Sequence, residues 1–178
     1  MVLKIDLRGH GESEGIATGS YYSGDYIIDT RNAIEALKTL PYVNKERIGL
    51  WGHSMAGNVV SRTLASKPDI KAVAIWAGAG YTYTDLLTYR INDQSYRPPA
   101  SNAPQTSRRQ ELAQRYGQFD TTNDFWKQVP MTNYLSDIQG AIGLFHAVDD
   151  TVVSIEYSRN LNTILNGTSI PHELHGIS

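Results

Sequence analysis

The chain has 178 residues, 40% of them hydrophobic and 19% charged, which is typical of a single globular domain with a real core. Its net charge of -2 gives no electrostatic reason to expect a nucleic acid or an anionic membrane as a partner, and the lack of cysteine excludes disulfides and thiolate chemistry. No apolar run approaches the ~20 residues of a membrane span, and the first residues become charged too early for a signal peptide. We therefore expect a cytoplasmic protein.

The first elements predicted along the chain are a strand, a loop and a helix. Three of the four residues 2–5 are apolar, and this segment indicates a buried strand. The glycine-rich stretch over residues 6–15 predicts a loop with unusual backbone angles. From residue 26 onward, apolar residues recur at helical spacing until Pro41 ends the helix. Residues 47–51 then predict a second buried strand.

Residues 52–57, Gly-His-Ser-Met-Ala-Gly, connect this strand to a helix expected over residues 58–65. A serine on a sharp turn between a strand and a helix is typical of a nucleophile elbow. Small neighbours are needed there because the strand and the helix nearly touch. Gly52 and Gly57 meet this need, while Ala56 stands where the usual Gly-x-Ser-x-Gly pattern has its second glycine.

The elbow interpretation makes Ser54 a candidate nucleophile. The helix N-terminus behind it would place the Met55 N–H, and a positive dipole end, where an oxyanion forms. A Gly-x-Ser-x-small sequence also recurs by chance, so it is the flanking strand and helix that favour the enzymatic interpretation.

Pro68 ends the elbow helix, and residues 71–77 predict the next buried strand. Residues 81–129 then show no strand pattern. We expect this insertion to form a helical cap over the sheet edge; a disordered excursion is the alternative, which the many aromatic residues disfavour. Polar helical segments are predicted over residues 84–91, 107–116 and 123–129, around a proline-rich linker at 98–104.

Alternation resumes after the insertion, with a strand over residues 141–147, a loop to 154, a helix over 155–165 and a last strand within 172–177. Buried strands that alternate with helices predict a mostly parallel sheet flanked by helices, here one α/β domain over residues 1–178. Such sheets bind ligands at the carboxyl ends of their strands. Ser54, the His10 loop and the Asp149 loop all follow such ends.

A serine nucleophile needs a base, and the base needs a carboxylate that fixes its tautomer. Asp149 is the first candidate for this carboxylate because it directly follows a predicted strand and lies after Ser54, in the Ser-Asp-His order of this elbow type. Asp150 is the alternative, although it would more naturally cap the turn or the next helix.

His172 and His175 follow Asp149 in the chain, and we take His175 as the candidate base. Because residues 173–177 also fit the last strand itself, a base beyond residue 178 stays open. The other histidines have different expected roles: His10 at the rim of the cleft as a further candidate base, His53 in the packing of the elbow, and His146 as a satisfied core histidine.

Four segments of the chain, in this order, resemble the α/β-hydrolase superfamily, especially the prolyl-oligopeptidase-like serine peptidases and related esterases. They are residues 6–13, 47–57, 133–138 and 146–153. The resemblance implies a three-layer α/β-hydrolase-like fold with Ser54 as nucleophile, Asp149 as triad acid and the Met55 N–H as half of the oxyanion hole. It also implies that residues 81–129 are a cap between the sixth and seventh strands of the family sheet.

The chain also departs from this family. Residues 2–6 match its fourth strand, so the first three strands, and the loop that donates the other oxyanion N–H, have no counterpart here. The family histidine follows the eighth strand, near residue 178.

We expect a serine hydrolase of small carboxylic esters or short peptides that works through an acyl-enzyme and uses neither a metal nor a cofactor. The alternative is a catalytically incomplete α/β-hydrolase scaffold. Such a scaffold would serve as a binding module, or would form a homo-oligomer through its exposed sheet edge.

Overall fold

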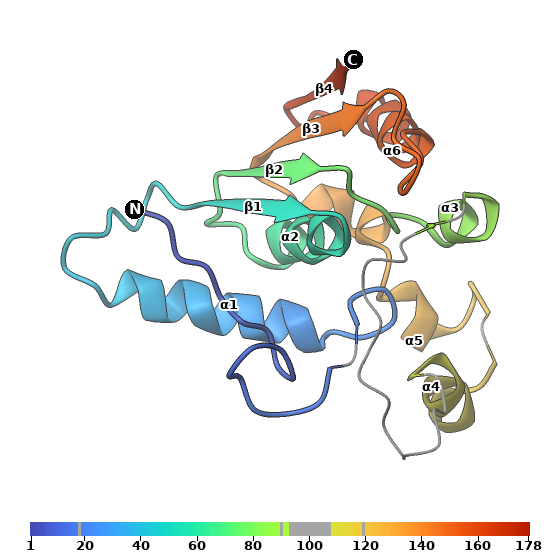
Figure 1. Ribbon diagram of the computed structural model, residues 1–178, viewed down its shortest axis with the longest axis horizontal. Helices are drawn as coiled ribbons and strands as arrows, with labels where there is room; N and C mark the ends of the chain where they lie inside the picture. Colours follow the sequence, from blue (N-terminus) through green and yellow to red (C-terminus); the bar gives the residue numbers. More distant parts are fainter. Residues whose placement is uncertain (18, 90, 93–107, 119) are drawn as a thin grey trace.

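The computed structural model describes residues 1–17, 19–89, 91–92, 108–118 and 120–178. At its centre lies a four-stranded sheet in the order β1-β2-β3-β4, with every neighbouring pair parallel (Figure 1). The strands are β1 (Gly49–His53), β2 (Ala72–Trp76), β3 (Ala141–Ala147) and β4 (His172–Ile177). The predicted α/β class, with a parallel sheet flanked by helices, is confirmed.

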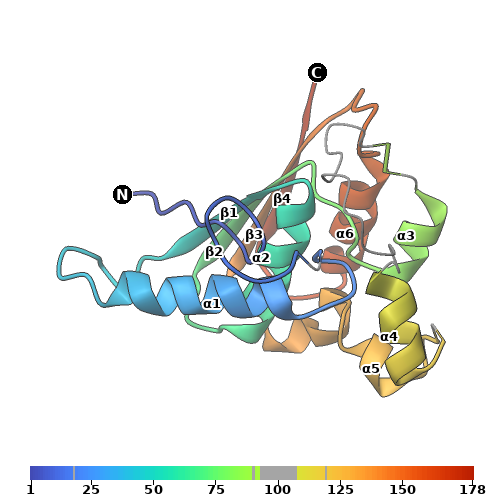
Figure 2. The same ribbon diagram turned by 60° about the horizontal axis from the view of Figure 1, so that its bottom comes forward.

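Three helices, α1 (Asp25–Lys38), α2 (Met55–Ser66) and α6 (Glu156–Asn166), lie on the same face of the sheet (Figure 2). Burial alternates strictly along β3, as expected when one side of a strand faces the core. The core between sheet and helices is apolar and close to fully buried; it includes Leu64, Val73, Ile75, Ile142, Leu144 and Leu161.

The other face of the sheet carries aromatic side chains that remain partly exposed. Trp51 is 65% exposed and Trp76 is 43% exposed. Trp76 stacks on Phe145 with ring centroids 5.6 Å apart, and Phe145 stacks on His175 at 4.9 Å. The register places these three residues opposite one another, so they form one row across β2, β3 and β4.

The strand predicted over residues 2–5 is wrong. This segment has no strand structure, and Val2 is 92% exposed. A strand must pair its backbone with a neighbour, and β1 is hydrogen-bonded only to β2 in the described sheet. Residues 2–5 do not join the free edge of β1, so their backbone is left to water.

The other predicted elements agree closely with the observed ones. Strand β3 has the predicted bounds, and β4 fills the predicted range of 172–177. Helix α1 starts one residue before the predicted position, and Pro41 follows shortly after its end. Strand β1 begins two residues later than predicted and continues to His53.

The described part of the insertion contains three helices, α3 (Tyr83–Thr88), α4 (Arg108–Tyr116) and α5 (Asp124–Lys127), and is followed by the 3-10 helix η1 (Met131–Asp137). In Figure 1, α3, α4 and α5 lie on the side toward which β1, β2 and β3 point. The helices share a small apolar cluster of their own, made of Tyr83, Leu112, Trp126 and Val129. The linker predicted at residues 98–104 lies outside the described residues, and the role of the insertion as a cap stays a prediction. None of the helices that the structure describes is both long and apolar enough to cross a membrane.

Candidate active site

Ser54 directly follows β1 and precedes the first residue of α2, with φ 54° and ψ −122°. A positive φ costs a non-glycine residue about 1–3 kcal/mol and persists only where the surroundings enforce it. Two backbone hydrogen bonds do so here. The Ser54 N–H donates to the Trp76 carbonyl at 2.9 Å, and the Gly57 N–H donates to the Ser54 carbonyl at 2.9 Å.

The two glycines beside Ser54 are needed for close packing. A Cβ at position 52 would lie 2.4 Å from the Ala56 carbonyl oxygen, and one at position 57 would lie 2.7 Å from Ile75 Cγ2. Neither distance is compatible with van der Waals contact. Gly52 therefore lets β1 approach the start of α2, as the sequence predicts, whereas Gly57 lets α2 approach β2.

The Ser54 hydroxyl is partly buried and has no hydrogen-bond partner among the described residues. Met55 is the first residue of α2, and the first N–H groups of a helix have no acceptor within it. The Ser54 hydroxyl, which has no hydrogen-bond partner among the described residues, thus lies beside the Met55 N–H, which has no acceptor within the helix, at the positive end of the helix dipole. This arrangement can deliver a nucleophile and stabilise an oxyanion at neighbouring positions.

Nothing in the sequence indicates how the loop after β2 holds the turn at Ser54. Ala77 has φ 45° although it is not glycine, and its N–H donates to the Phe145 carbonyl at 2.9 Å. The Asn58 side chain, on the first turns of α2, donates from Nδ2 to the Gly80 carbonyl at 2.6 Å. Only the glycines at 78 and 80 mark this loop in the sequence.

The two carboxylates after β3 have different environments. Asp150 accepts the N–H groups of Val152 and Val153 through Oδ1, at 2.8 and 2.9 Å. It therefore stabilises the turn, as expected for the alternative candidate. Asp149 is exposed, has no hydrogen-bond partner in the part of the chain that the structure describes, and lies at the same sheet edge as Ser54. Its role as triad acid stays a prediction.

The structure does not bring His175 to Ser54. The His175 ring stacks on Phe145 in the aromatic row on the open face of the sheet, which is the face without helices, and its Nε2 lies 3.2 Å from Glu173 Oε1. Strands β1 and β4 are separated by three inter-strand spacings, which is about 14 Å. The assignment of His175 as the base stays a prediction from chain order.

The other histidines have partners of their own. His146 is buried between the Ser158 hydroxyl (2.7 Å) and the Val153 carbonyl (2.8 Å), so its prediction as a satisfied core histidine is confirmed. His10 contacts Tyr26, His53 stacks on Trp51 at the open face rather than in the elbow, and His172 contacts Ile170 and Asn166. No three His, Asp or Glu side chains within the described ranges gather closely enough to hold a metal ion.

The loop over residues 6–15 is held against α1 by a hydrogen-bonded ion pair between Arg8 and Asp29. Arg8 donates from Nε and Nη2 to Asp29, with the shortest contact at 2.6 Å, and its backbone N–H donates to the same carboxylate at 3.1 Å. The hydrogen bonds from Arg8 lower the pKa of Asp29. Gly9 and Gly11 have φ of 73° and 56°, which confirms the predicted unusual backbone angles.

A parallel sheet in which one strand leads through a serine with positive φ into a helix is the arrangement expected of an α/β hydrolase. Residues 1–93, just over half of the chain, match the family described as serine aminopeptidase, S33. The chain belongs to this family, and the predicted membership of the α/β-hydrolase superfamily is confirmed. No curated protein sequence matched the chain.

Solved structures of peptidases and esterases share the fold. A puromycin-hydrolyzing peptidase of Mycobacterium tuberculosis is 13% identical with a TM-score of 0.62, over 90% of this chain and 22% of its own. An acylaminoacyl peptidase of Pyrococcus horikoshii is 15% identical with a TM-score of 0.62, over 93% and 26%. Acetyl xylan esterase 1 of Thermoanaerobacterium sp. is 18% identical with a TM-score of 0.58, over 97% and 58%. The chain thus spans about a quarter of each peptidase and over half of the esterase.

Proposed function

We propose that the protein is a serine hydrolase whose nucleophile is Ser54. The observation that carries the proposal is the backbone of Ser54, held at φ 54° between β1 and α2 with its hydroxyl uncommitted. Strain at a residue that makes no structural hydrogen bond through its side chain is typical of a functional position. Membership of a serine aminopeptidase family supports the same assignment.

The reaction would be acyl transfer. The Ser54 oxygen attacks the substrate carbonyl while a histidine, predicted to be His175, takes its proton, and Asp149 orients that histidine. The Met55 N–H donates to the oxyanion of the tetrahedral intermediate. The histidine then protonates the leaving alcohol or amine, and water releases the acyl group by the reverse sequence of proton transfers.

For the substrate we propose small carboxylic esters, with short peptides as the alternative. The solved structures of this fold include both an acetyl xylan esterase and peptidases, so both kinds of acyl compound fit the scaffold. Hydrolysis of p-nitrophenyl acetate and of an aminoacyl p-nitroanilide, compared on the same protein, would distinguish them. We expect faster turnover of the ester per molecule of protein.

The direct test is labelling of the purified chain with a fluorophosphonate, with the modified residue identified by mass spectrometry. We expect one adduct, at Ser54, and none in Ser54→Ala. The control is Ser66→Ala, which removes an exposed hydroxyl at the other end of α2 and should label like the wild type. A folded wild type that gives no adduct would refute the proposal.

The placement of His175 favours a second candidate, a binding module without turnover. No histidine contacts Ser54 among the described residues, and β1 leaves one edge of the sheet free for self-association. In this case Ser54 would not be labelled, although an ester analogue would bind saturably. Sedimentation velocity would then show a homo-oligomer that dissociates when a proline replaces Leu50 in the edge strand.

A further inference from the structure

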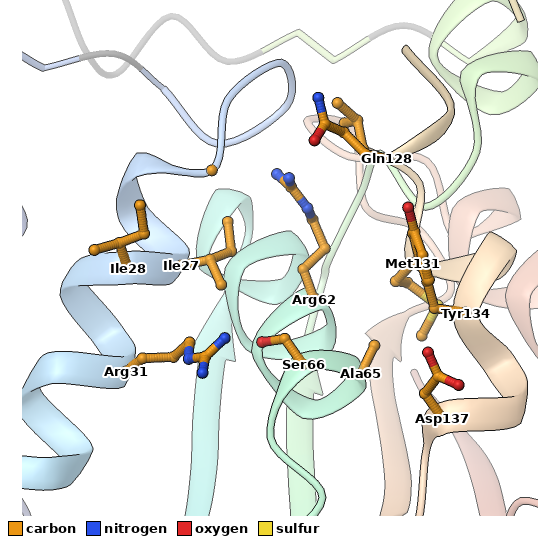
Figure 3. Close-up of a pocket in the computed structure, with 12 residues that line it drawn as sticks. Ile27, Ile28, Arg31, Arg62, Ala65, Ser66, Gln128, Met131, Tyr134 and Asp137 are labelled. Carbon is orange, nitrogen blue, oxygen red and sulfur yellow. The ribbon is translucent and has the colours of Figure 1, made fainter. Parts of the chain in front are cut away.

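A cavity of about 430 Å³ opens between α1, α2 and η1 (Figure 3). Its α2 wall includes Arg62, eight residues after Ser54, which is about 12 Å along the helix. The cavity is therefore separate from the candidate active site. Its volume lies within the roughly 300–1,000 Å³ of known small-molecule pockets.

The most informative residue of this cavity is Arg62, a partly buried cation with no counter-ion among the residues that the structure describes. Its Nη1 donates to the backbone carbonyls of Ser20 and Ser23, both at 2.7 Å. A guanidinium has five N–H donors, so the edge formed by Nε and Nη2 is left without an acceptor in the described residues. Burial lowers the pKa of Arg62 to about 10, so the group is still charged at neutral pH.

An unpaired edge of this kind fits one class of anion. Buried charges are normally paired because desolvation of a lone ion is costly. The Nε/Nη2 edge matches the two oxygens of a carboxylate, with two parallel hydrogen bonds. Tyr134, on η1 at the other side of the cavity, has a hydroxyl without a described partner that can donate to the same anion.

The remaining walls provide an apolar surface. Ile27 and Ile28 of α1 lie on one side and Met131 lies on the other (Figure 3), and Val129 also lines the cavity. Asp137 lies at the end of the cavity away from the Arg62 guanidinium, where it would repel a second anionic group. Arg31 of α1 also lines the cavity, so the lining has two arginines and one aspartate. Together with the apolar walls, this net charge of +1 favours a ligand with one negative charge and an apolar body.

We propose that this cavity binds a small amphipathic monocarboxylate, with its carboxylate on the Nε/Nη2 edge of Arg62 and its apolar chain between Ile27 and Met131. The proposal does not depend on Ser54. A protein that binds the acid but carries out no hydrolysis would still agree with it.

The test is calorimetric titration with octanoate, alongside acetate, which has the charge without the chain, and octylammonium, which has the chain with the opposite charge. We expect saturable binding of octanoate and at least tenfold weaker binding of the other two. Octylammonium binding as tightly as octanoate would overturn the proposal, as would the absence of octanoate binding.

Two variants locate the binding. Arg62→Lys keeps the charge but removes the planar guanidinium edge that would bind both carboxylate oxygens. It should weaken octanoate binding about tenfold or more, because hydrogen bonds to a charged group are lost. Ala65→Leu fills the cavity without changing Arg62, so it keeps the test valid if Arg62→Lys does not fold. Arg159→Lys, at an exposed site on α6, is the matched control and should bind like the wild type. Octanoate binding that neither Arg62→Lys nor Ala65→Leu weakens would place the ligand elsewhere and refute the proposal.

Discussion

Replacement of Ser54 by glycine is expected to stabilise the protein, although glycine usually destabilises a helix interior. The serine caps α2 at φ 54° but makes no capping hydrogen bond through its side chain, so its removal loses none. Strain at such a backbone conformation costs about 1–3 kcal/mol, and glycine relieves it because it lacks the Cβ. Glycine also makes the unfolded chain more flexible, which costs about 0.5–1 kcal/mol. The net expectation is a gain of roughly 1 kcal/mol.

Ser54→Ala separates strain from loss of the hydroxyl. Alanine keeps the Cβ and therefore the strain, so its free energy of unfolding should stay within about 0.5 kcal/mol of the wild type. Urea unfolding of the three proteins, at equal m-values, gives the comparison. We expect the order Ser54→Gly above Ser54→Ala and wild type, while both variants lose fluorophosphonate labelling.

The reverse order would refute the argument. At a position with ordinary helical φ, glycine is about 1 kcal/mol less stable than alanine. Ser66, in the last turn of α2, serves as this reference, because its glycine variant should be less stable than its alanine variant. If the Ser54 pair behaves like the Ser66 pair, the elbow is not strained and the main support for Ser54 as nucleophile is lost.

Three further predictions concern packing and charge. Gly52→Ala should destabilise the protein by about 2–3 kcal/mol in urea unfolding and abolish labelling, because the new Cβ meets backbone at 2.4 Å; Gly167→Ala, whose nearest contact is 3.4 Å, is the control and should change stability by less than about 0.5 kcal/mol. Asp29→Asn should cost about 1 kcal/mol near neutral pH; because the pKa of Asp29 is lowered by Arg8, the wild type loses this advantage as pH falls through that lowered pKa, and an unchanged difference at low pH would contradict this. Asp85→Asn should have the opposite pH dependence, because burial raises the pKa of Asp85 and the wild type loses stability as pH rises toward that raised pKa. Urea midpoints measured at increasing pH from the acidic side should show the variant becoming more stable relative to the wild type. A difference in midpoint that does not change with pH would refute this.

The strands and helices were predictable wherever local pattern and tertiary packing favour the same structure. Strand β3 alternates between buried and intermediate residues along its whole length, and its predicted bounds are those observed. The tight turn at Ser54 was predictable for a similar reason on its β1 side, since Gly52 is required by contact with Ala56, four residues later; Gly57 is instead required by the distant Ile75 of β2. Contacts between residues close in sequence restrict which residue types can occupy those positions, so they can be predicted from the sequence.

Features that depend on distant partners were not predictable. Residues 2–5 have the composition of a buried strand, but composition does not supply the neighbour that a strand needs. The positive φ of Ala77 and the hydrogen bond from Asn58 to Gly80 also depend on the way two loops meet. No residue type marks such positions in the sequence.

The position of the base follows from strand geometry. The nucleophile and the proposed acid both lie just past a strand end, Ser54 after His53 and Asp149 shortly after Ala147. His175 instead lies two residues before the end of β4, within the row of aromatic side chains on the open face. A side chain at this register points out of the sheet rather than past its edge. His175→Ala therefore decides the assignment: a labelling rate at Ser54 reduced by several orders of magnitude would make His175 the base, and an unchanged rate would rule it out.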